Sequence, residues 1–300
     1  MDRARTRIEG VTPEVPEGHT IHRLARRHKR LFLGAALTAG SPQGRFAAGA
    51  AAIDGRVLRG TDAYGKHLFH DYGGRWLHVH LGLYGTFLDG PGAPPPERGQ
   101  VRLLLAGARK PDEPHWAELR GPAACELLDE AARDALLARL GPDPLRRDSD
   151  PEQAWKKIAR SRTSIGALLM RQDVVSGVGN VYRAEVLYRA KIEPYRSGRD
   201  LTAAEWGWIW DDLVGLMAEG VRLGRIVTLR PEDVSGPEDV SGPEDRKLAA
   251  EPEGSGSRRD RGARTYVYHR AGRPCRICGT PIQTAVVEAR NLFWCPHCQR

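Results

Sequence analysis

Four cysteines near the C-terminus have the spacing of a metal site. They form two Cys-x2-Cys pairs, Cys275 with Cys278 and Cys295 with Cys298, and sixteen residues separate the pairs. Each pair makes a tight turn that presents two thiolates, and four thiolates are a preferred tetrahedral set for Zn²⁺. We expect one structural zinc ion on a β-hairpin; two disulfides are the alternative, which a cytosolic compartment disfavours. Four thiolates leave no open coordination position, so a catalytic zinc is not expected.

A second candidate site is a glycine pair in the middle of the chain. The segment Gly177-Val-Gly-Asn180 stands between two stretches that we expect to be helical. Its glycines allow a tight turn and a close approach of backbone N–H groups to a phosphate, and Asn180 can donate to an adjacent phosphate. Taken alone, the segment is equally consistent with an ordinary corner between two helices.

The overall charge makes nucleic acid a candidate partner without identifying it. The 300 residues hold 46 Lys and Arg against 38 Asp and Glu, a net charge of +8. Most of the excess is in the last forty residues, where seven arginines face one acid, Glu288. No run approaches the roughly 18 apolar residues of a membrane span. No apolar core follows the first residues, so we do not expect a secretory signal. Membrane, collagenous and fully disordered classes are excluded, and we expect no membrane partner.

Hydrophobic periodicity divides the chain into segments that must position these residues. Ile21, Leu24, His28 and Leu31 recur at helical spacing, and short strands with Gly/Pro turns follow from about 35 to 128. Residues 130–140 are expected to be helical, and Gly141–Pro151 marks a domain boundary. Further helices are expected over Ala154–Ser161, Ile165–Arg171, Val181–Ala190 and Ala203–Leu223. The hexapeptide that begins at Pro231 repeats from Pro237, which indicates a flexible acidic insertion, and β-residues return from Thr265.

Five separated motifs, in order, resemble those of the formamidopyrimidine-DNA glycosylase / endonuclease VIII family. Leu168–Ala190 resembles its helix–two-turn–helix element, and Ala289–Gln299 resembles its zinc finger with an arginine at the hairpin tip. The other three motifs are Pro16-Glu-Gly-His-Thr-Ile-His-Arg, Gly65-Lys66-His-Leu and His80-Leu-Gly-Leu-Tyr-Gly85. The first resembles the mature N-terminus of the endonuclease VIII-like branch. The resemblance covers about residues 15–300.

The resemblance implies an α+β fold with a zinc finger. Its parts are a tail or misassigned start (1–15), an N-terminal helix with a catalytic β-sandwich (16–140), a helix–two-turn–helix DNA-binding domain (152–228), an acidic repeat loop (229–262) and a four-cysteine finger (263–300). It also implies a bacterial, cytoplasmic, nucleoid-associated enzyme that acts as a monomer on double-stranded damaged DNA. The implied activity is excision of oxidised bases, pyrimidines more than purines, with β/δ-elimination at the abasic site.

The family pattern also implies a role for each matched residue. Pro16, as a free N-terminal secondary amine, would attack the sugar C1′ and form a Schiff base, while Glu17 would shuttle protons at the sugar. Lys66 and Arg290 would contact phosphates at the lesion and assist the eliminations. The DNA-contacting residues would be Leu83 and Tyr84 as a wedge in the duplex, Arg120 on the opposite strand, Asn180 and Arg290.

Each of these residues also has a plain structural interpretation. Pro16 and Glu17 suit the first turn of a helix, Lys66 and Arg290 suit an exposed surface, and Leu83 and Tyr84 suit a core. A non-catalytic DNA-binding protein on the same scaffold is therefore the alternative. A zinc-ribbon protein-interaction module is a third interpretation, but it leaves the helix–turn–helix motifs unexplained.

Two features depart from the family pattern. Pro16 is internal in the printed chain, and an amide nitrogen has no basic lone pair, so the Schiff-base mechanism requires that Pro16 be freed. We hypothesise that Val15 is the true start, read as an initiator methionine and removed; proteolysis before Pro16 is a second route. Thr20 stands where several family members carry a glutamate, which leaves the lesion preference open.

Overall fold

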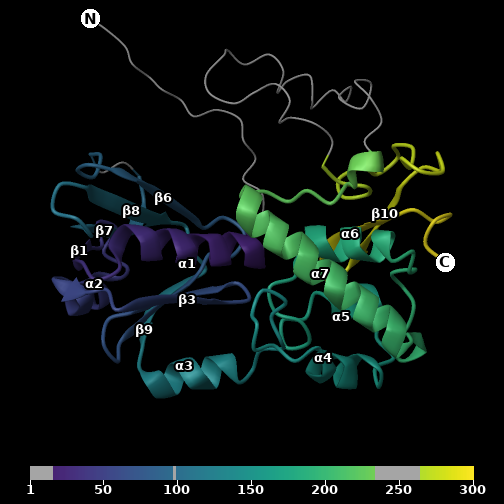
Figure 1. Ribbon diagram of the computed structural model, residues 1–300, viewed down its shortest axis with the longest axis horizontal. Coiled ribbons are helices and arrows are strands. Elements are labelled where there is room, and N and C mark those ends of the chain that lie inside the picture. Colours follow the sequence, from purple (N-terminus) through teal and green to yellow (C-terminus); the bar gives the residue numbers. More distant parts are fainter. Residues whose placement is uncertain (1–15, 97–98, 234–263) are drawn as a thin grey trace, which may run out of the picture.

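The computed structural model describes residues 16–96, 99–233 and 264–300 and shows a mixed α+β fold. The chain forms two halves that meet where helix α1 (Gly18–Phe32) approaches helix α7 (Ala203–Leu223), as Figure 1 shows. A β-sandwich occupies one half, and helices with a small hairpin occupy the other. No helix in the described ranges is long and apolar enough to cross a membrane. The expected tail (1–15) and most of the repeat loop (234–262) lie outside the described residues.

The sandwich consists of two antiparallel sheets. One sheet has five strands in the order β2-β1-β7-β8-β6, and the other has four in the order β3-β4-β5-β9. The strands are β1 (Ala36–Gly40), β2 (Arg56–Val57), β3 (Gly60–Tyr64), β4 (His67–Asp71), β5 (Trp76–His80), β6 (Thr86–Pro91), β7 (Val101–Ala108), β8 (Pro114–Arg120) and β9 (Ala124–Leu128). Helices α2 (Ala47–Ile53) and α3 (Glu130–Leu137) flank them.

Apolar side chains that alternate with more exposed ones along the strands, together with one apolar face of α1, form the sandwich core. Leu68 on β4 lies opposite Val79 on β5, and both are buried against Leu103 and Leu105 of the other sheet. Ile21 and Phe32 of α1 join the same cluster, so the expected helical spacing does face the core. The N-terminal helix is thus fixed by the sheets, and with it the position of the residues that precede it.

Two histidines are buried in this core. His28 of α1 and His70 of β4 are fully inaccessible, and His28 Nδ1 lies 3.0 Å from His70 Nε2. Within the described part of the chain, the remaining ring nitrogens of both residues have no hydrogen-bond partner. Burial, reinforced by the charge of Arg27, lowers the pKa of His28 to about 3, and burial also lowers the pKa of His70 well below its ordinary value. Both rings are therefore neutral in the folded protein at neutral pH.

This pair predicts loss of stability in acid. The pKa of His28 in the folded protein lies below its unfolded value of about 6.5. The contribution of the neutral ring to the free energy of unfolding is therefore intact above pH 6.5 and is lost as the pH falls towards 3. At pH 4.5 the loss from His28 alone is expected to be roughly 2–3 kcal/mol of unfolding free energy. Urea unfolding between pH 7.5 and 4.5 measures it. The double variant His28→Leu/His70→Leu should show a shallower pH dependence; an unchanged slope would contradict this explanation.

The segment that joins the two halves is buried, unlike an ordinary exposed linker. Gly141, Pro142, Asp143 and Pro144 are all buried. The Gly141 N–H donates to Gln172 O (2.9 Å), and the Ser176 N–H donates to Pro142 O (3.0 Å), so the linker is hydrogen-bonded to the helical half. The Gly-Pro-Asp-Pro composition predicts only a turn, whereas the tertiary structure makes it part of the interface.

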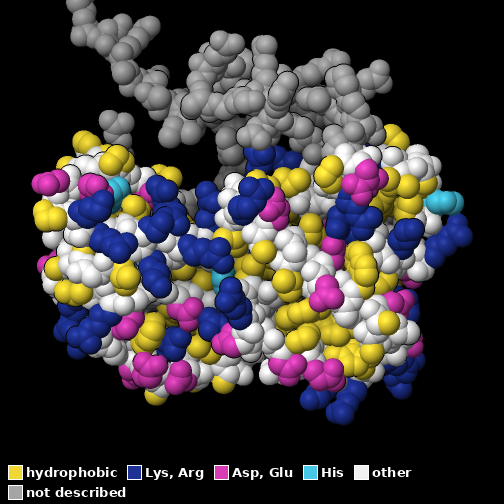
Figure 2. Space-filling model, in the orientation of Figure 1, with side chains coloured by type: hydrophobic (Ala, Val, Ile, Leu, Met, Phe, Trp, Pro, Cys, Tyr) yellow, Lys and Arg dark blue, Asp and Glu magenta, His cyan; other side chains and the backbone are white. Residues whose placement is uncertain are grey.

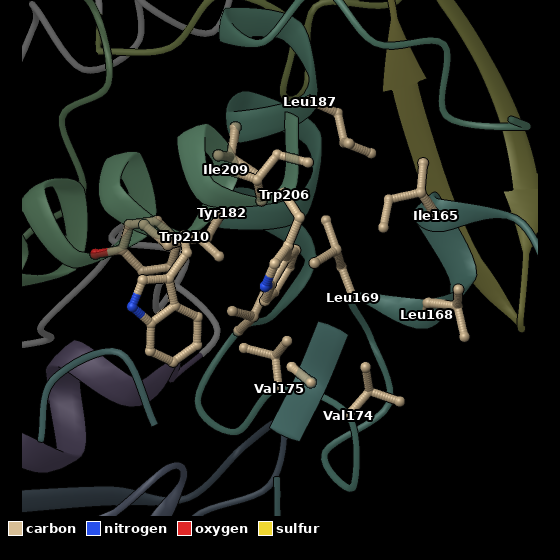
Figure 3. Close-up of a cluster of buried hydrophobic side chains, with 14 of the residues drawn as sticks. Ile165, Leu168, Leu169, Val174, Val175, Tyr182, Leu187, Trp206, Ile209 and Trp210 are labelled. Carbon is tan, nitrogen blue, oxygen red and sulfur yellow. The ribbon is translucent and has the colours of Figure 1, made fainter. Parts of the chain in front are cut away.

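The helical half has its own core. It comprises α4 (Pro151–Ile158), α5 (Ile165–Leu168), α6 (Asn180–Arg189) and α7, with short 3-10 turns at Gly198–Asp200 and Pro231–Asp233. In Figure 3 the Trp206 ring lies among side chains of neighbouring segments, including Leu169 and Val175. Helix α7 has the predicted bounds and begins with a capping box formed by Thr202 and Glu205. Helix α5 is shorter than expected and ends at Leu168.

The finger packs on helix α6. Its hairpin consists of β10 (Gln283–Val287) and β11 (Arg290–Trp294), and Tyr188 of α6 shares a buried cluster with Cys275 and Phe293. One expectation is wrong here, since the β-type residues from Thr265 suggest a strand. Residues 265–268 do not form a β-strand, because their amides bond to a side chain of α6 instead of a neighbouring strand. Leu229 is buried and Asp233 accepts from the Tyr266 hydroxyl, so the first described residues of the predicted acidic loop contact the rest of the protein.

Candidate active site and zinc centre

The carboxylate of Glu17 lies at the N-terminus of helix α6. Glu17 is fully buried, and it accepts backbone N–H bonds from Gly179 (2.8 Å), Val181 (2.8 Å) and, at greater length, Tyr182 (3.4 Å). The first amides of a helix have no partner within it and attract a negative charge. The sequence predicts either a turn whose amides approach a phosphate or an ordinary corner between helices. The structure instead directs the Gly179 amide to Glu17.

Three glycines explain how the segments approach so closely. Gly18 N–H donates to Gly177 O (2.8 Å), and a Cβ on Gly18 would lie 2.9 Å from Gly177 Cα. A Cβ on Gly65 would lie 3.0 Å from Gly177 N. Gly177 and Gly65 also have positive φ values of 89° and 56°, which disfavour any other residue. The start of α1, the Lys66 turn and the approach to α6 therefore meet backbone to backbone.

Charges of three segments interact at this junction. Burial raises the pKa of Glu17, although the nearby Lys66 charge and the amide bonds oppose the shift. Burial lowers the pKa of Lys66, while Glu17 raises it and Arg290 lowers it further. The structure thus brings together Glu17, Lys66 and Arg290, which are far apart in the sequence. Pro16 precedes Glu17 and is half-buried; in the printed chain its nitrogen is bonded to Val15.

Asp143 positions the Lys66 turn, and sequence reasoning missed it. This fully buried carboxylate accepts from the Gly65 N–H (2.7 Å) through Oδ2, the oxygen that also lies 2.7 Å from His22 Nε2 of α1. Its other oxygen accepts from the Leu145 N–H (2.9 Å). An acid between two prolines in a linker has no local signal that distinguishes it from a turn residue.

Leu83 and Tyr84 lie on an exposed turn between β5 and β6. Tyr84 is 82% exposed and Leu83 is 43% exposed, so the interpretation of these two residues as core is wrong. The turn is closed at its base, where Gly85 N–H donates to Leu81 O (3.0 Å) and Leu81 is buried. Arg120 is close by, because its neighbour Gly121 packs against the Tyr84 carbonyl. The Arg120 guanidinium is held by Glu118 (2.9 Å) and remains partly exposed.

Asn180 and Arg183 connect α6 with the finger. Asn180 is the first residue of α6, and its Oδ1 accepts from Arg183. Arg183, which sequence analysis did not single out, is fully buried and donates to Asn291 O on β11 (3.1 Å) and to Gly166 O (3.3 Å). Burial lowers the pKa of Arg183 to about 10, which still leaves the guanidinium charged at neutral pH. A cation thus holds the finger beside the N-terminus of α6.

Arg290 lies beside the tip of the hairpin. It pairs with Val287 across a two-residue turn, Glu288-Ala289, and its side chain is exposed. Both turn residues have positive φ values, 50° and 56°, which this turn geometry requires and which Gly and Asn adopt more easily. The tip therefore presents Arg290 to solvent near Lys66, where it is available for an anionic ligand.

The four cysteines fit a zinc ion. Their sulfur atoms all lie within 4.8 Å of one another; Cys278 and Cys295 are 3.5 Å apart, and Cys275 and Cys298 are 3.9 Å apart. Tetrahedral Zn²⁺ with Zn–S bonds of about 2.3 Å places its sulfurs about 3.8 Å apart. The donor set and its geometry thus suit one structural zinc ion. No other group of three or more candidate ligands is found in the described ranges.

The face that carries α1 is rich in cations. In Figure 2, Lys and Arg side chains spread over the middle of this face, and acidic side chains lie between them and along the lower edge. Helix α1 contributes Arg26, Lys29 and Arg30, which are exposed. A surface of this kind attracts a polyanion towards the junction of the two halves.

Comparison with known proteins agrees with this architecture. Family models match the formamidopyrimidine-DNA glycosylase N-terminal domain at residues 13–122, its H2TH domain at 140–230 and the zinc finger found in FPG and IleRS at 272–300. The protein named Endonuclease 8 1 of Mycobacterium bovis is 50% identical over 290 residues, which covers 95% of this chain and all of the relative. The chain belongs to the formamidopyrimidine-DNA glycosylase / endonuclease VIII family.

Further relatives extend the similarity to both branches of the family. The formamidopyrimidine-DNA glycosylase of Symbiobacterium thermophilum is 31% identical over 296 residues and covers 96% of this chain and 89% of the relative. A crystal structure of Lactococcus lactis Fpg with abasic-site DNA is 21% identical, covers 95% of this chain and 99% of that one, and superposes with a TM-score of 0.71. This last similarity shows the shared fold.

Membership confirms several expectations. The protein is a DNA glycosylase of a DNA-repair family whose members also have abasic-site lyase activity. The four-cysteine finger is the family's zinc finger, so the structural zinc is confirmed as well.

Proposed function

We propose that this protein is a bifunctional glycosylase and abasic-site lyase that excises oxidised bases, preferentially pyrimidines, from double-stranded DNA. The observation that carries the proposal is the junction at which Glu17, Lys66 and Arg290 interact, with Pro16 adjacent to Glu17. The pyrimidine preference rests on the resemblance to the endonuclease VIII branch and on the 50% identical relative that bears that name. DNA as the substrate makes the bacterial nucleoid the expected location, and the protein is expected to act as a monomer.

Pro16 is proposed as the nucleophile in a form of the protein that begins at this residue. A free α-amino group has a pKa of about 8, so part of it is unprotonated at neutral pH. Its lone pair attacks C1′ of the damaged nucleoside, the base leaves with a proton, and the sugar ring opens to an iminium. Elimination of the 3′ and then the 5′ phosphate follows, and hydrolysis of the iminium frees the amine.

Glu17 is proposed to move the protons in these steps. Its carboxyl is adjacent to Pro16, and its raised pKa keeps it protonated to a higher pH than an exposed glutamate. The amides of α6 hold it in one orientation. Lys66 and Arg290 are proposed to bind the phosphates next to the lesion and to stabilise them as leaving groups. The zinc, when bound, supplies structure only, since it holds the hairpin that carries Arg290.

The wedge and the remaining contacts open the duplex. Extrusion of a base costs a few kcal/mol of stacking, which the exposed Leu83 and Tyr84 offset by filling the gap. Arg120, beside this turn, is proposed to contact the opposite strand. Asn180 is proposed to donate to a backbone phosphate through its side-chain amide.

Borohydride trapping on DNA with an abasic site tests the proposal. A protein that begins at Pro16 is expected to form a covalent adduct with the DNA. The chain from Met1 is expected to bind the same DNA without an adduct, because the Pro16 nitrogen is then an amide. Pro16→Gly keeps a free but primary amine, so it is expected to give an adduct yield between those of the two proteins. Mass spectrometry of the native protein determines its first residue.

The non-catalytic alternative predicts a different result. If the protein that begins at Pro16 binds abasic-site DNA but gives no adduct, the scaffold is a damaged-DNA-binding module. If the chain from Met1 is trapped as efficiently as the shorter one, Pro16 is not the nucleophile.

A further inference from the structure

The sulfur of Cys275 has a hydrogen-bond partner outside the finger. The Tyr188 hydroxyl of α6 lies 3.1 Å from Cys275 Sγ, and Tyr188 is only 5% exposed. Its ring stacks on Tyr266, with ring centroids 4.8 Å apart and planes 26° apart. Burial of Tyr188 and its stack on Tyr266 therefore hold the hydroxyl in this direction, towards the Cys275 sulfur.

The direction of this bond follows from the chemistry of the metal site. A cysteine that ligates Zn²⁺ is a thiolate and can only accept, so the phenol must donate. The Cys295 sulfur accepts instead from a backbone donor, the N–H of Cys298 (3.5 Å), within the same Cys-x2-Cys pair. Cys275 instead depends on a side chain of the helical domain.

We propose that Tyr188 is an outer-sphere residue of the zinc centre, which holds the Cys275 thiolate and joins the metal site to helix α6. Such partners fix the orientation of a ligand and tune its donor strength, and their loss typically weakens metal binding by 10–100-fold. Helix α6 begins with the amides that hold Glu17 and ends near Tyr188. The same short helix thus contacts the catalytic carboxylate at one end and a zinc ligand at the other.

The full chain with Tyr188→Phe tests the proposal, because it removes the hydroxyl and keeps the stacked ring. Zinc affinity, measured by competition with a chromogenic chelator, is expected to fall by about 10–100-fold. In protein loaded with Co²⁺, the sulfur-to-cobalt charge-transfer band is expected to move to longer wavelength, because a thiolate without its donor is the stronger electron donor. Far-ultraviolet circular dichroism confirms that the variant is folded.

Tyr266→Phe is the matched control. It removes the other hydroxyl of the same ring stack, which bonds Asp233 and the Arg230 N–H instead of a sulfur. The cobalt band should stay in place in this variant. An unchanged band and an unchanged zinc affinity in folded Tyr188→Phe would overturn the proposal; a band that moves equally in both variants would assign the effect to packing and overturn it too.

Discussion

Replacing Glu17 by Gln is expected to lower base excision by about 10²–10⁴-fold in the protein that begins at Pro16. The amide is nearly isosteric, but at neutral pH it can neither give up a proton to the departing base nor take one from the sugar. It also presents an NH₂ group towards the amides of Gly179 and Val181, where the carboxylate now accepts from both. The measurement is single-turnover excision of an oxidised pyrimidine from a duplex, with substrate binding determined separately.

A second reaction and a control variant separate the role of Glu17 in base loss from a general effect on the protein. Trapping on a pre-formed abasic site should fall less than excision, because no base has to leave. Glu130→Gln, which changes an exposed acid whose carboxylate accepts from Trp76 on the sandwich, should leave both reactions unchanged. Excision within threefold of the parent protein in Glu17→Gln would remove this residue from the proposed mechanism.

Replacing Glu185 by Ala is expected to detach the finger from the helical domain. The Glu185 carboxylate is fully buried in α6 and accepts from the N–H groups of Tyr266 (2.7 Å), Val267 (2.8 Å) and Tyr268 (2.8 Å), and from the Thr228 hydroxyl. Each buried donor left without an acceptor costs about 1–3 kcal/mol. Their loss together is expected to destabilise the finger by about 3 kcal/mol or more.

Hydrogen exchange at residues 266–268 is the direct measurement of this effect. Exchange should accelerate strongly in Glu185→Ala, and DNA affinity should fall because Arg290 is no longer held near Lys66. Glu219→Ala, which removes a partly exposed acid paired with Arg222 on α7, should change neither quantity. Protection of these amides at the parent level in Glu185→Ala would show that the finger docks without this carboxylate.

Much of the fold follows from local sequence patterns. The spacing of Ile21, Leu24 and His28 is visible within one helix, and the capping residues Thr202 and Glu205 mark the start of α7 three positions apart. The structural zinc is predicted for the same reason, since the four cysteines lie in two short turns on one hairpin. These features depend on contacts between residues that are close in the chain, so the sequence alone predicts them.

The expectation of a strand at 265–268 fails for the opposite reason. Thr265-Tyr-Val-Tyr has the composition of a strand, but propensity is a weak prior where a stronger acceptor is present. Glu185, about eighty positions earlier, takes three of the amides that a neighbouring strand would otherwise bond. Only the packed structure brings that acceptor within reach.

The sequence alone determined the family, the zinc ligands and the residue types available for catalysis. The tertiary structure decided how they are used. The carboxylate of Glu17 and the amides of Gly179 and Val181 are more than 160 positions apart, and the Gly65 amide and Asp143 are 78 positions apart. Such contacts depend on how two domains pack, where three glycines permit an approach that any Cβ would prevent. A buried acid carries no local pattern that reveals its partner, because the partner is chosen by the fold.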